Sequence, residues 1–283
     1  YPFEYAGRNC SASRQYKRAE EILIDCLDGR KQLFGIEHAN TLATMNDLAI
    51  VYQSLGKKEE ARLLHTESLQ INKALFGLES ERTLTIMNNL ATINQEMGNF
   101  EEAEILSREC VETAKRLFGA NNKYVLIFSG NFAKILQDLN QYDEAESMFL
   151  DCLPRFREIF GNDHPNSLQL INNLSELYYS KNEDEKAEPL ILECFETRNR
   201  VLGPYHPLTV KSLFNLTLLR NTHGKFNGQQ LSECLTACQS AFGTENPDTL
   251  LVMMLYATHL QSLRQFTRQK PLLSNVFCCP TAF

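Results

Sequence analysis

A Phe-Gly pair returns along this chain at a fixed interval, and that interval constrains the fold more than any other feature. Successive copies lie 42 residues apart, the fifth copy has Leu in place of Phe, and the sixth follows after 40 residues. The pairs are Phe34-Gly35, Phe76-Gly77, Phe118-Gly119, Phe160-Gly161, Leu202-Gly203 and Phe242-Gly243. A fixed period in this range is typical of stacked repeat arrays, in which each unit packs on its neighbours. Such arrays usually act through a long surface rather than one pocket, so the period favours a binding scaffold.

Each period has the pattern of two amphipathic helices. Between Thr41 and Tyr52, apolar side chains are spaced by three and four residues, which predicts a helix of about four turns. Gly56 is placed to end that helix in a left-handed conformation, and a second helix is predicted from Lys57 to Leu75. Because two such helices cannot bury their apolar faces alone, we predict an all-α fold of antiparallel helix pairs stacked side by side.

The period also divides the chain into repeats. Residues 1–35 form a partial first repeat that is mainly a second helix, and residues 244–283 form a degenerate C-terminal capping repeat. Full repeats between them are residues 36–77, 78–119, 120–161, 162–203 and 204–243. In the last repeat no glycine ends the first helix, and Pro271 interrupts the predicted second one. Since the first helix of the first repeat is cut short, with Ala6-Gly7 as its end, we expect a fragment of a longer protein.

Composition narrows the class of partner. The formal charge of −7 argues against a nucleic-acid backbone as the main partner, because that needs a basic stripe. The longest nearly apolar stretch, Leu250 to Leu260, is far short of the ~20 residues that cross a bilayer, so no membrane insertion is expected. Cysteine recurs at one phase of the period, which indicates packing positions, reduced thiols and a cytoplasmic location. These positions are Cys26, Cys110, Cys152, Cys194 and Cys234, and Cys278-Cys279 is the exception.

Histidines in the linkers suggest a metal site at first sight. His38, His164 and His206 each precede a first helix, but neighbouring units are ~10 Å apart whereas a Zn–N bond is ~2 Å. We therefore expect a capping or packing role, and no metal or other cofactor. The chain also lacks a Gly-Lys-Ser/Thr phosphate loop, a His-Glu-x-x-His motif and a Gly-x-Ser-x-Gly motif, so we predict that it is not an enzyme.

The spacing Leu48-Ala49-x-x-Tyr52-x-x-x-Gly56 resembles the tetratricopeptide repeat. The longer 42-residue period, an Asn-Leu-Ala triplet and the linking pairs His164-Pro165 and His206-Pro207 resemble the repeats of kinesin light chains. The resemblance covers essentially the whole chain. It implies a right-handed superhelical solenoid of stacked antiparallel helix pairs, in which the first helices line a concave groove that holds an extended peptide.

The resemblance also implies which residues line that groove. In kinesin light chains the Asn two places before the Ala of the triplet holds the peptide backbone. Here that position is Asn89, Asn131, Asn173 and Asn215, with Asp47 in the first full repeat. The remaining predicted groove residues are Asn46, Asn88 and Asn172, one place earlier, together with Gln95, Lys134 and Lys211. With only two cations in the set, we do not expect a preference for acidic cargo.

Two roles are open for this row of asparagines. A primary amide offers an acceptor and two donors, so it pairs with peptide N–H and C=O groups alike. Alternatively the amides form hydrogen bonds to the neighbouring repeat. One of these reasons is needed, because Asn is a poor helix former and four copies recur on one helix face.

The predicted function is a non-catalytic interaction scaffold or adaptor. It would bind an extended peptide or a partner segment in the concave groove, as the resemblance to kinesin light chain cargo recognition implies. The alternative is a sensor or regulatory repeat region of a larger signalling ATPase or multidomain protein, which the incomplete first repeat motivates. A nucleotide-binding loop upstream would favour the sensor, and a heptad coiled coil would favour a motor light chain.

Overall fold

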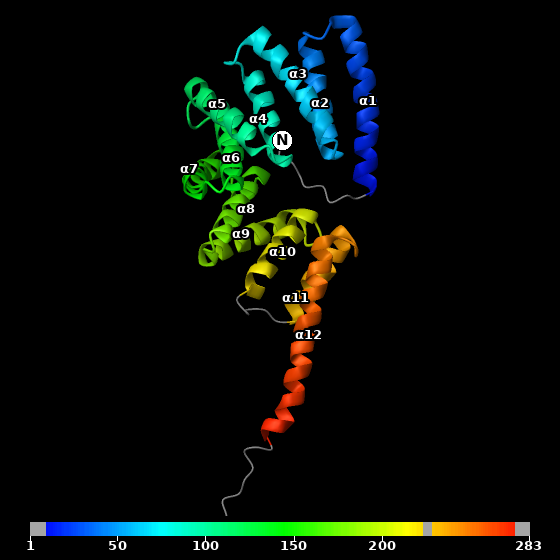
Figure 1. Cartoon of the computed structure of the whole chain (residues 1–283), viewed down its shortest axis with the longest axis vertical. Coiled ribbons are helices and arrows are strands. Elements are labelled where there is room, and N and C mark those ends of the chain that lie inside the picture. Colours follow the sequence, from blue (N-terminus) through cyan, green and yellow to red (C-terminus); the bar gives the residue numbers. More distant parts are fainter. Residues whose placement is uncertain (1–9, 223–227, 275–283) are drawn as a thin grey trace, which may run out of the picture. The chain divides into compact units, whose positions relative to one another are not determined.

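The computed structural model describes residues 10–222 and 228–274, and all regular structure in them is α-helical (Figure 1). This confirms the predicted all-α class. The helices are α1 (Cys10–Phe34), α2 (Ala39–Ser54), α3 (Lys58–Phe76), α4 (Glu81–Glu96), α5 (Phe100–Phe118), α6 (Lys123–Asp138), α7 (Tyr142–Phe160), α8 (Pro165–Ser180), α9 (Asp184–Leu202), α10 (Pro207–Thr222), α11 (Gly228–Phe242) and α12 (Pro247–Ser274).

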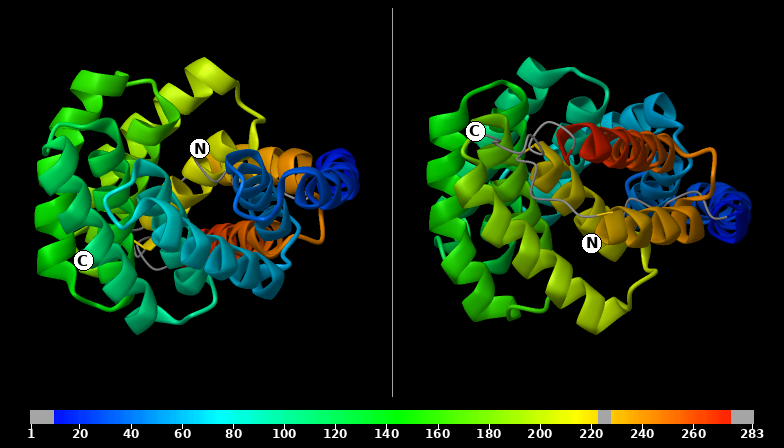
Figure 2. Two further views of the ribbon diagram at one scale, coloured as in Figure 1. Left: turned by 90° about the horizontal axis from the view of Figure 1, so that it is seen from above. Right: turned by 90° about the horizontal axis from the view of Figure 1, so that it is seen from below.

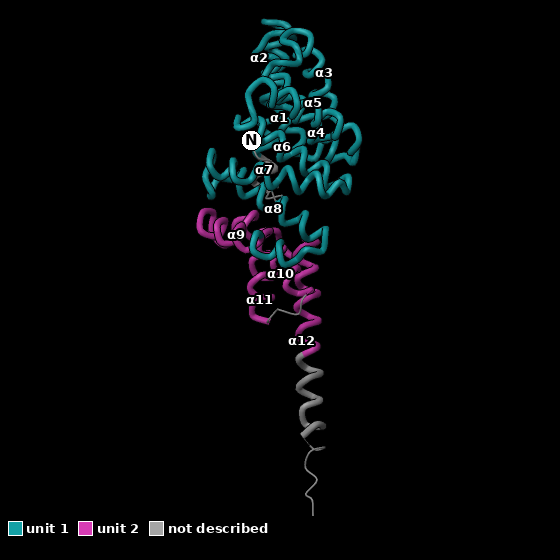
Figure 3. The backbone as a smooth tube through the Cα atoms, turned by 90° about the vertical axis from the view of Figure 1, so that its left-hand side faces the viewer, with its two compact units in different colours: residues 1–190 teal, residues 191–283 magenta. Residues whose placement is uncertain are grey.

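The chain forms two compact units, residues 1–190 and residues 191–283 (Figure 3). In the first unit each helix from α2 to α8 packs against the one before it, and Figure 2 shows these helices following one another in chain order from blue to green. In addition α4 contacts α6 and α6 contacts α8, so the first helices of neighbouring pairs meet. In the second unit α11 packs against both α10 and α12. The predicted stacking of helix pairs is confirmed, whereas the repeat boundaries stay a prediction.

Helices α1 to α9 and α11 end where the chain adopts a positive φ. Gly56 follows α2 with φ 77°, as predicted, and Lys57 N–H donates to the Tyr52 carbonyl at 2.9 Å, the long bond of a Schellman turn. At the same phase Gly98 has φ 83°, and Asn140 takes the place of glycine with φ 60°. These turns return the chain beside the helix it has just left, which is what allows each pair to form.

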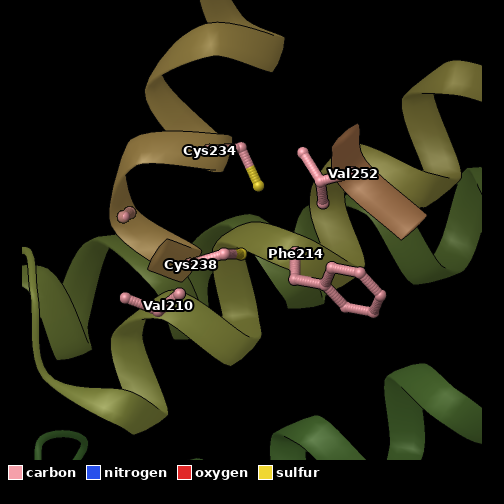
Figure 4. Packing of buried hydrophobic residues seen from close by; sticks show 6 residues of the cluster. Val210, Phe214, Cys234, Cys238 and Val252 are labelled. Carbon is pink, nitrogen blue, oxygen red and sulfur yellow. The ribbon is translucent and has the colours of Figure 1, made fainter. Parts of the chain in front are cut away.

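The free cysteines are packing residues. Cys110, Cys152, Cys194 and Cys234 are buried, and Cys26 at the same phase is half-buried. Burial raises the pKa of the Cys110 thiol to about 12 and that of Cys152 to about 11, so both stay protonated at neutral pH. Figure 4 shows Cys234 and its neighbour Cys238 in an apolar cluster of the second unit. The expected packing role is confirmed for these thiols, the cytoplasmic location stays a prediction, and Cys278-Cys279 lie outside the described residues.

The linker histidines cap the first helices, as expected. In His38, His164 and His206, Nδ1 accepts a hydrogen bond from the backbone N–H two residues later, at 3.2, 3.1 and 3.2 Å. The rings of His38 and His164 also stack on Phe34 and Phe160, with centroids 4.8 Å apart in both pairs. The described residues contain no group of three His, Cys, Asp or Glu side chains that could hold a metal ion.

The end of the array differs from the sequence-based expectation. Two helices separated by a turn were predicted in residues 244–283, with Pro271 interrupting the second, but α12 runs without a break from Pro247 to Ser274. The reason is local, because the position held by Gly98 and Asn140 in earlier repeats is Arg264 here. Without a residue that adopts a positive φ readily, the helix continues. None of the described helices is both long and apolar enough to span a bilayer.

Candidate functional site

The predicted groove residues of the first unit lie on its first helices, at matching places. Asp47 lies on α2, Asn89 on α4, Asn131 on α6 and Asn173 on α8. Asp47 is exposed and the three asparagines are half-buried, so all four reach the surface. We call the surface formed by these four residues and their neighbours on the same helices the first-helix face.

Hydrogen bonds between asparagines link successive first helices. Asn89 Nδ2 donates to Asn46 Oδ1 at 3.0 Å, which joins α4 to α2, and Asn131 Nδ2 donates to Asn88 Oδ1 at 3.1 Å, which joins α6 to α4. We call each of these bonds a rung. Both residues of a rung were predicted groove residues, so part of their hydrogen-bonding capacity serves the stack itself.

The third rung of this series is missing for a steric reason. It would join Asn173 on α8 to position 130 on α6, where Gly130 has no side chain. A Cβ atom at Gly130 would lie 3.1 Å from Leu170 Cδ1, so glycine permits the close approach of α6 and α8. Asn173 Oδ1 instead accepts a bond from Gln169 Nε2 on its own helix at 2.8 Å.

A second series of bonds runs parallel to the asparagines. Gln53 Nε2 donates to Glu96 Oε1 at 2.6 Å, and Gln95 Nε2 donates to Asp138 Oδ2 at 2.7 Å. Glu96 and Asp138 were not predicted groove residues. The sequence could have predicted these two carboxylates. They lie 42 residues apart, and each follows a glutamine of the preceding first helix by 43 residues.

Lys134, a predicted groove cation, is held between carboxylates. Its Nζ lies 3.2 Å from Glu176 Oε2 on α8 and 3.5 Å from Asp138 Oδ1 on its own helix. Burial acts to lower the pKa of Lys134, but the two nearby charges and hydrogen bonds outweigh burial and raise the pKa above its ordinary value. Asn172 Nδ2 contacts the other oxygen of Glu176 at 2.9 Å, so this lysine is part of a connected network.

Two of the predicted residues belong to the second unit and are described there by themselves. Lys211 Nζ lies 2.9 Å from Asp248 Oδ2 and 4.8 Å from the centroid of the Phe214 ring. Asn215, on the same helix α10, is half-buried. The contacts of the first unit therefore bring together Asn46, Asn88, Asn89, Asn131, Gln95 and Lys134, and they place Asn172 and Asn173 on the next first helix.

Comparison with known proteins gives the family context. The family model described as "Tetratricopeptide repeat" matches residues 5–74, 64–116, 82–149 and 124–196, which together make up more than half of the chain. No curated protein matches this chain.

Several solved structures share the fold. BtubC (BKLC) from P. vanneervenii is 18% identical, with 83% of this chain and 93% of that chain covered and a TM-score of 0.63. Nearly identical repeats of a putative kinesin light chain from Podospora anserina are 21% identical, cover 70% and 98%, and have a TM-score of 0.53. The quorum sensor NprR from B. thuringiensis is 14% identical, with coverages of 86% and 66% and a TM-score of 0.65. At these identities the likeness shows the fold alone.

Proposed function

Because this chain belongs to the tetratricopeptide repeat family, we propose that it is a non-catalytic interaction scaffold whose first-helix face binds an extended peptide or partner segment. One observation carries the proposal. Amide side chains stand at matching places on consecutive first helices, and the rungs from Asn89 and Asn131 hold them in a fixed orientation.

The rungs leave capacity for a ligand. A primary amide has two N–H donors and a carbonyl acceptor, and each rung uses one donor of Asn89 or Asn131. The carbonyl oxygen and the second N–H are the two groups that a peptide backbone needs as partners. One asparagine side chain can therefore form the rung and bind a ligand at the same time. Because the rung already fixes the orientation of the amide, less side-chain entropy is lost when a ligand binds.

The spacing of the helices suits an extended chain. Packed helices lie roughly 8–10 Å apart, and an extended chain advances ~3.3 Å per residue. A bound segment would then present about every third residue to successive first helices. The four first helices α2, α4, α6 and α8 would accommodate roughly nine to twelve residues on this estimate.

The test is binding of the chain to an immobilised library of random 12-residue peptides, followed by affinity measurement on the best binders. We expect binders at tens of micromolar or tighter, and Asn89→Ala with Asn131→Ala to weaken them about tenfold or more, since each amide bond contributes ~0.5–1.5 kcal/mol. The matched control is Asn121→Ala with Asn162→Ala, two exposed asparagines in the turns before α6 and α8.

Melting curves separate binding from folding. The double variant in the rungs loses about 1 kcal/mol per hydrogen bond but gains roughly 0.5 kcal/mol per site from the better helix propensity of Ala, so stability changes little. A large loss of melting temperature with unchanged peptide affinity would contradict the ligand-binding role. Failure to recover any peptide at tens of micromolar would contradict the proposal as a whole.

A second candidate function is that of a regulatory or sensing region within a larger protein. The observation in its favour is that the fold aligns with about two thirds of NprR, a protein named a quorum sensor. Sequencing the complete gene decides between the two, because a nucleotide-binding loop in the same protein would favour this candidate.

A further inference from the structure

We propose that the segment bound by the first-helix face is basic, with Lys or Arg side chains at intervals of about three residues. This inference rests on the proposed function and adds the chemical class of the partner. It starts from the charges that the face keeps after its internal contacts are made.

Carboxylates outnumber cations along the middle and carboxyl-terminal halves of the first helices. Each of the four first helices carries one of these carboxylates, called the carboxylate row here: Asp47 on α2, then Glu96 on α4 and Asp138 on α6, which share one phase of the period, and Glu176 on α8. Two ammonium groups contact the row: Lys134, between Asp138 and Glu176, and Lys58, whose Nζ lies 3.7 Å from Glu96 Oε2. Burial raises the pKa of Asp47, while Asn46 and the charge of Arg30 act to lower it, so Arg30 is a third cation beside these carboxylates. Four carboxylates against three cations leave a net negative charge, and Lys134 is already committed to its two partners.

Each of four amides on the face already uses one of its two N–H donors. Gln53 and Gln95 donate to the carboxylates of the next helix, and Asn89 and Asn131 donate to the preceding one. What remains is the second N–H of each amide and a larger number of acceptor positions on the carboxylate and amide oxygens. A ligand that supplies N–H donors therefore complements the face better than one that supplies acceptors.

Gln137 provides an independent sign of the same deficit of donors. It stands at the phase of Gln53 and Gln95, but the residue 43 places later is Ser180 rather than a carboxylate. Its side chain is only 6% exposed, and its Oε1 has no hydrogen-bond partner among the described residues. Buried acceptors are normally paired, so Gln137 marks a local shortage of donors inside the stack, although a surface ligand does not reach this atom.

Cations are present at the other end of the same helices. Arg82 and Lys123 lie in the first turns of α4 and α6, together with Glu81. Each cation packs over an aromatic ring, with 5.7 Å from Arg82 Cζ to the Phe76 centroid and 4.9 Å from Lys123 Nζ to the Tyr124 centroid. The basic segment is therefore expected along the carboxylate row and not at the amino-terminal ends of these helices.

The test compares three fluorescein-labelled 12-residue peptides of Gly and Ser that carry Lys, Glu or Gln at every third position. Fluorescence anisotropy with the 283-residue chain should rank them Lys, then Gln, then Glu. Affinity for the Lys peptide should fall by roughly tenfold between 0.05 and 0.5 M salt, because salt screens exposed charges.

Matched variants locate the binding site. Asp138→Asn with Glu176→Gln removes two charges and keeps one oxygen in each side chain, enough for the bonds from Gln95 and Lys134, and it should weaken the Lys peptide about tenfold. The contacts of Lys134 with Asp138 and of Asn172 with Glu176 lose their acceptor oxygens. Glu101→Gln with Glu102→Gln makes the same charge change on exposed residues of α5, and it should leave affinity unchanged within about twofold. If the first variant melts at a clearly lower temperature, Asp47→Asn on exposed Asp47 makes the same test.

Each outcome has a distinct meaning. If none of the three peptides binds, the proposed function fails. If the Glu or Gln peptide binds as tightly as the Lys peptide, the charge preference is wrong while the proposed function stands. If both variant pairs weaken the Lys peptide equally, the peptide binds elsewhere on the acidic surface and the assignment to the first-helix face is overturned.

Discussion

His65 shows how strongly the environment of a residue governs its chemistry in this array. Its side chain, on α3, is 1% exposed, and neither ring nitrogen has a hydrogen-bond partner within the described part of the chain. The same phase of the period holds Leu23, Phe149 and Ile191 in other repeats. Burial lowers the pKa of His65 from 6.5 to about 4, because the interior disfavours the charged imidazolium.

This shift predicts a pH dependence of stability. The pKa is lower in the folded state, so the folded protein binds fewer protons between pH 6.5 and 4 and loses stability as the pH falls through that window. The contribution is fully present above pH 6.5, and its loss amounts to about 3 kcal/mol at pH 4. His65→Leu, which copies Leu23, should flatten urea-unfolding stability against pH by that amount. The same slope in the wild type and the variant would show that His65 is not the group responsible.

At this scale the sequence predicted which residues recur but not which atoms pair. Periodicity assigns Asn46, Asn88, Asn89 and Asn131 to one helix face. Each rung joins two residues that are 43 positions apart in the chain. It therefore depends on how neighbouring first helices are aligned, and a local sequence pattern does not specify that alignment. The absence of a third rung follows from Gly130 in the sequence, whereas the packing of Leu170 against that glycine is seen only in the structure.

The helices end at two kinds of left-handed position. After first helices the residue is Gly98 in one repeat and Asn140 in the next, with φ 83° and 60°. After the second helices α1, α3, α5, α7, α9 and α11 it is glycine, and at Gly119 φ is 78° with ψ 156°. The first position is near the left-handed helical region that Asn tolerates, whereas the second lies where essentially only glycine is found.

A matched pair of substitutions tests this distinction. Gly98→Asn copies the native Asn140 and should cost at most about 1 kcal/mol of unfolding free energy. Gly119→Asn should cost roughly 1–3 kcal/mol, although no atom crowds either site, because the backbone conformation itself is strained for a side chain. Urea unfolding of both variants provides the comparison. Equal costs at the two sites would refute the conformational explanation.

Element boundaries were predictable where a turn or capping residue marked them, and the prediction was wrong in the last repeat, where no such residue stands. The turn after α2 follows from Gly56, and the cap before α8 follows from His164 and Pro165. In the last repeat the period predicted a turn between two helices. Instead α12 continues through that position, because Arg264 stands where earlier repeats have Gly or Asn. The identity of the residue at the turn position thus decides whether a helix ends there, even where the period predicts an end.

At the scale of the whole molecule, most of the first unit follows from one repeated pattern. From α1 to α8 each helix packs on its chain neighbours, so short-range periodicity is enough to predict this part of the stack. The division into units at residues 190 and 191, inside α9, was not predictable, because the 42-residue period runs through it without a change. The proposed use of the first-helix face for binding would be a property of the stack and not of one repeat.

The most direct test of that use maps where a bound peptide lies. A binding peptide with benzoylphenylalanine at its centre is photo-crosslinked to the unmodified chain, and the attachment sites are identified by mass spectrometry. Our account predicts attachment within α4 and α6 on the first-helix face, near Thr92 and Lys134. Attachment concentrated on the exposed apolar residues of the second helices, such as Ile105 on α5 and Leu150 on α7, would contradict it.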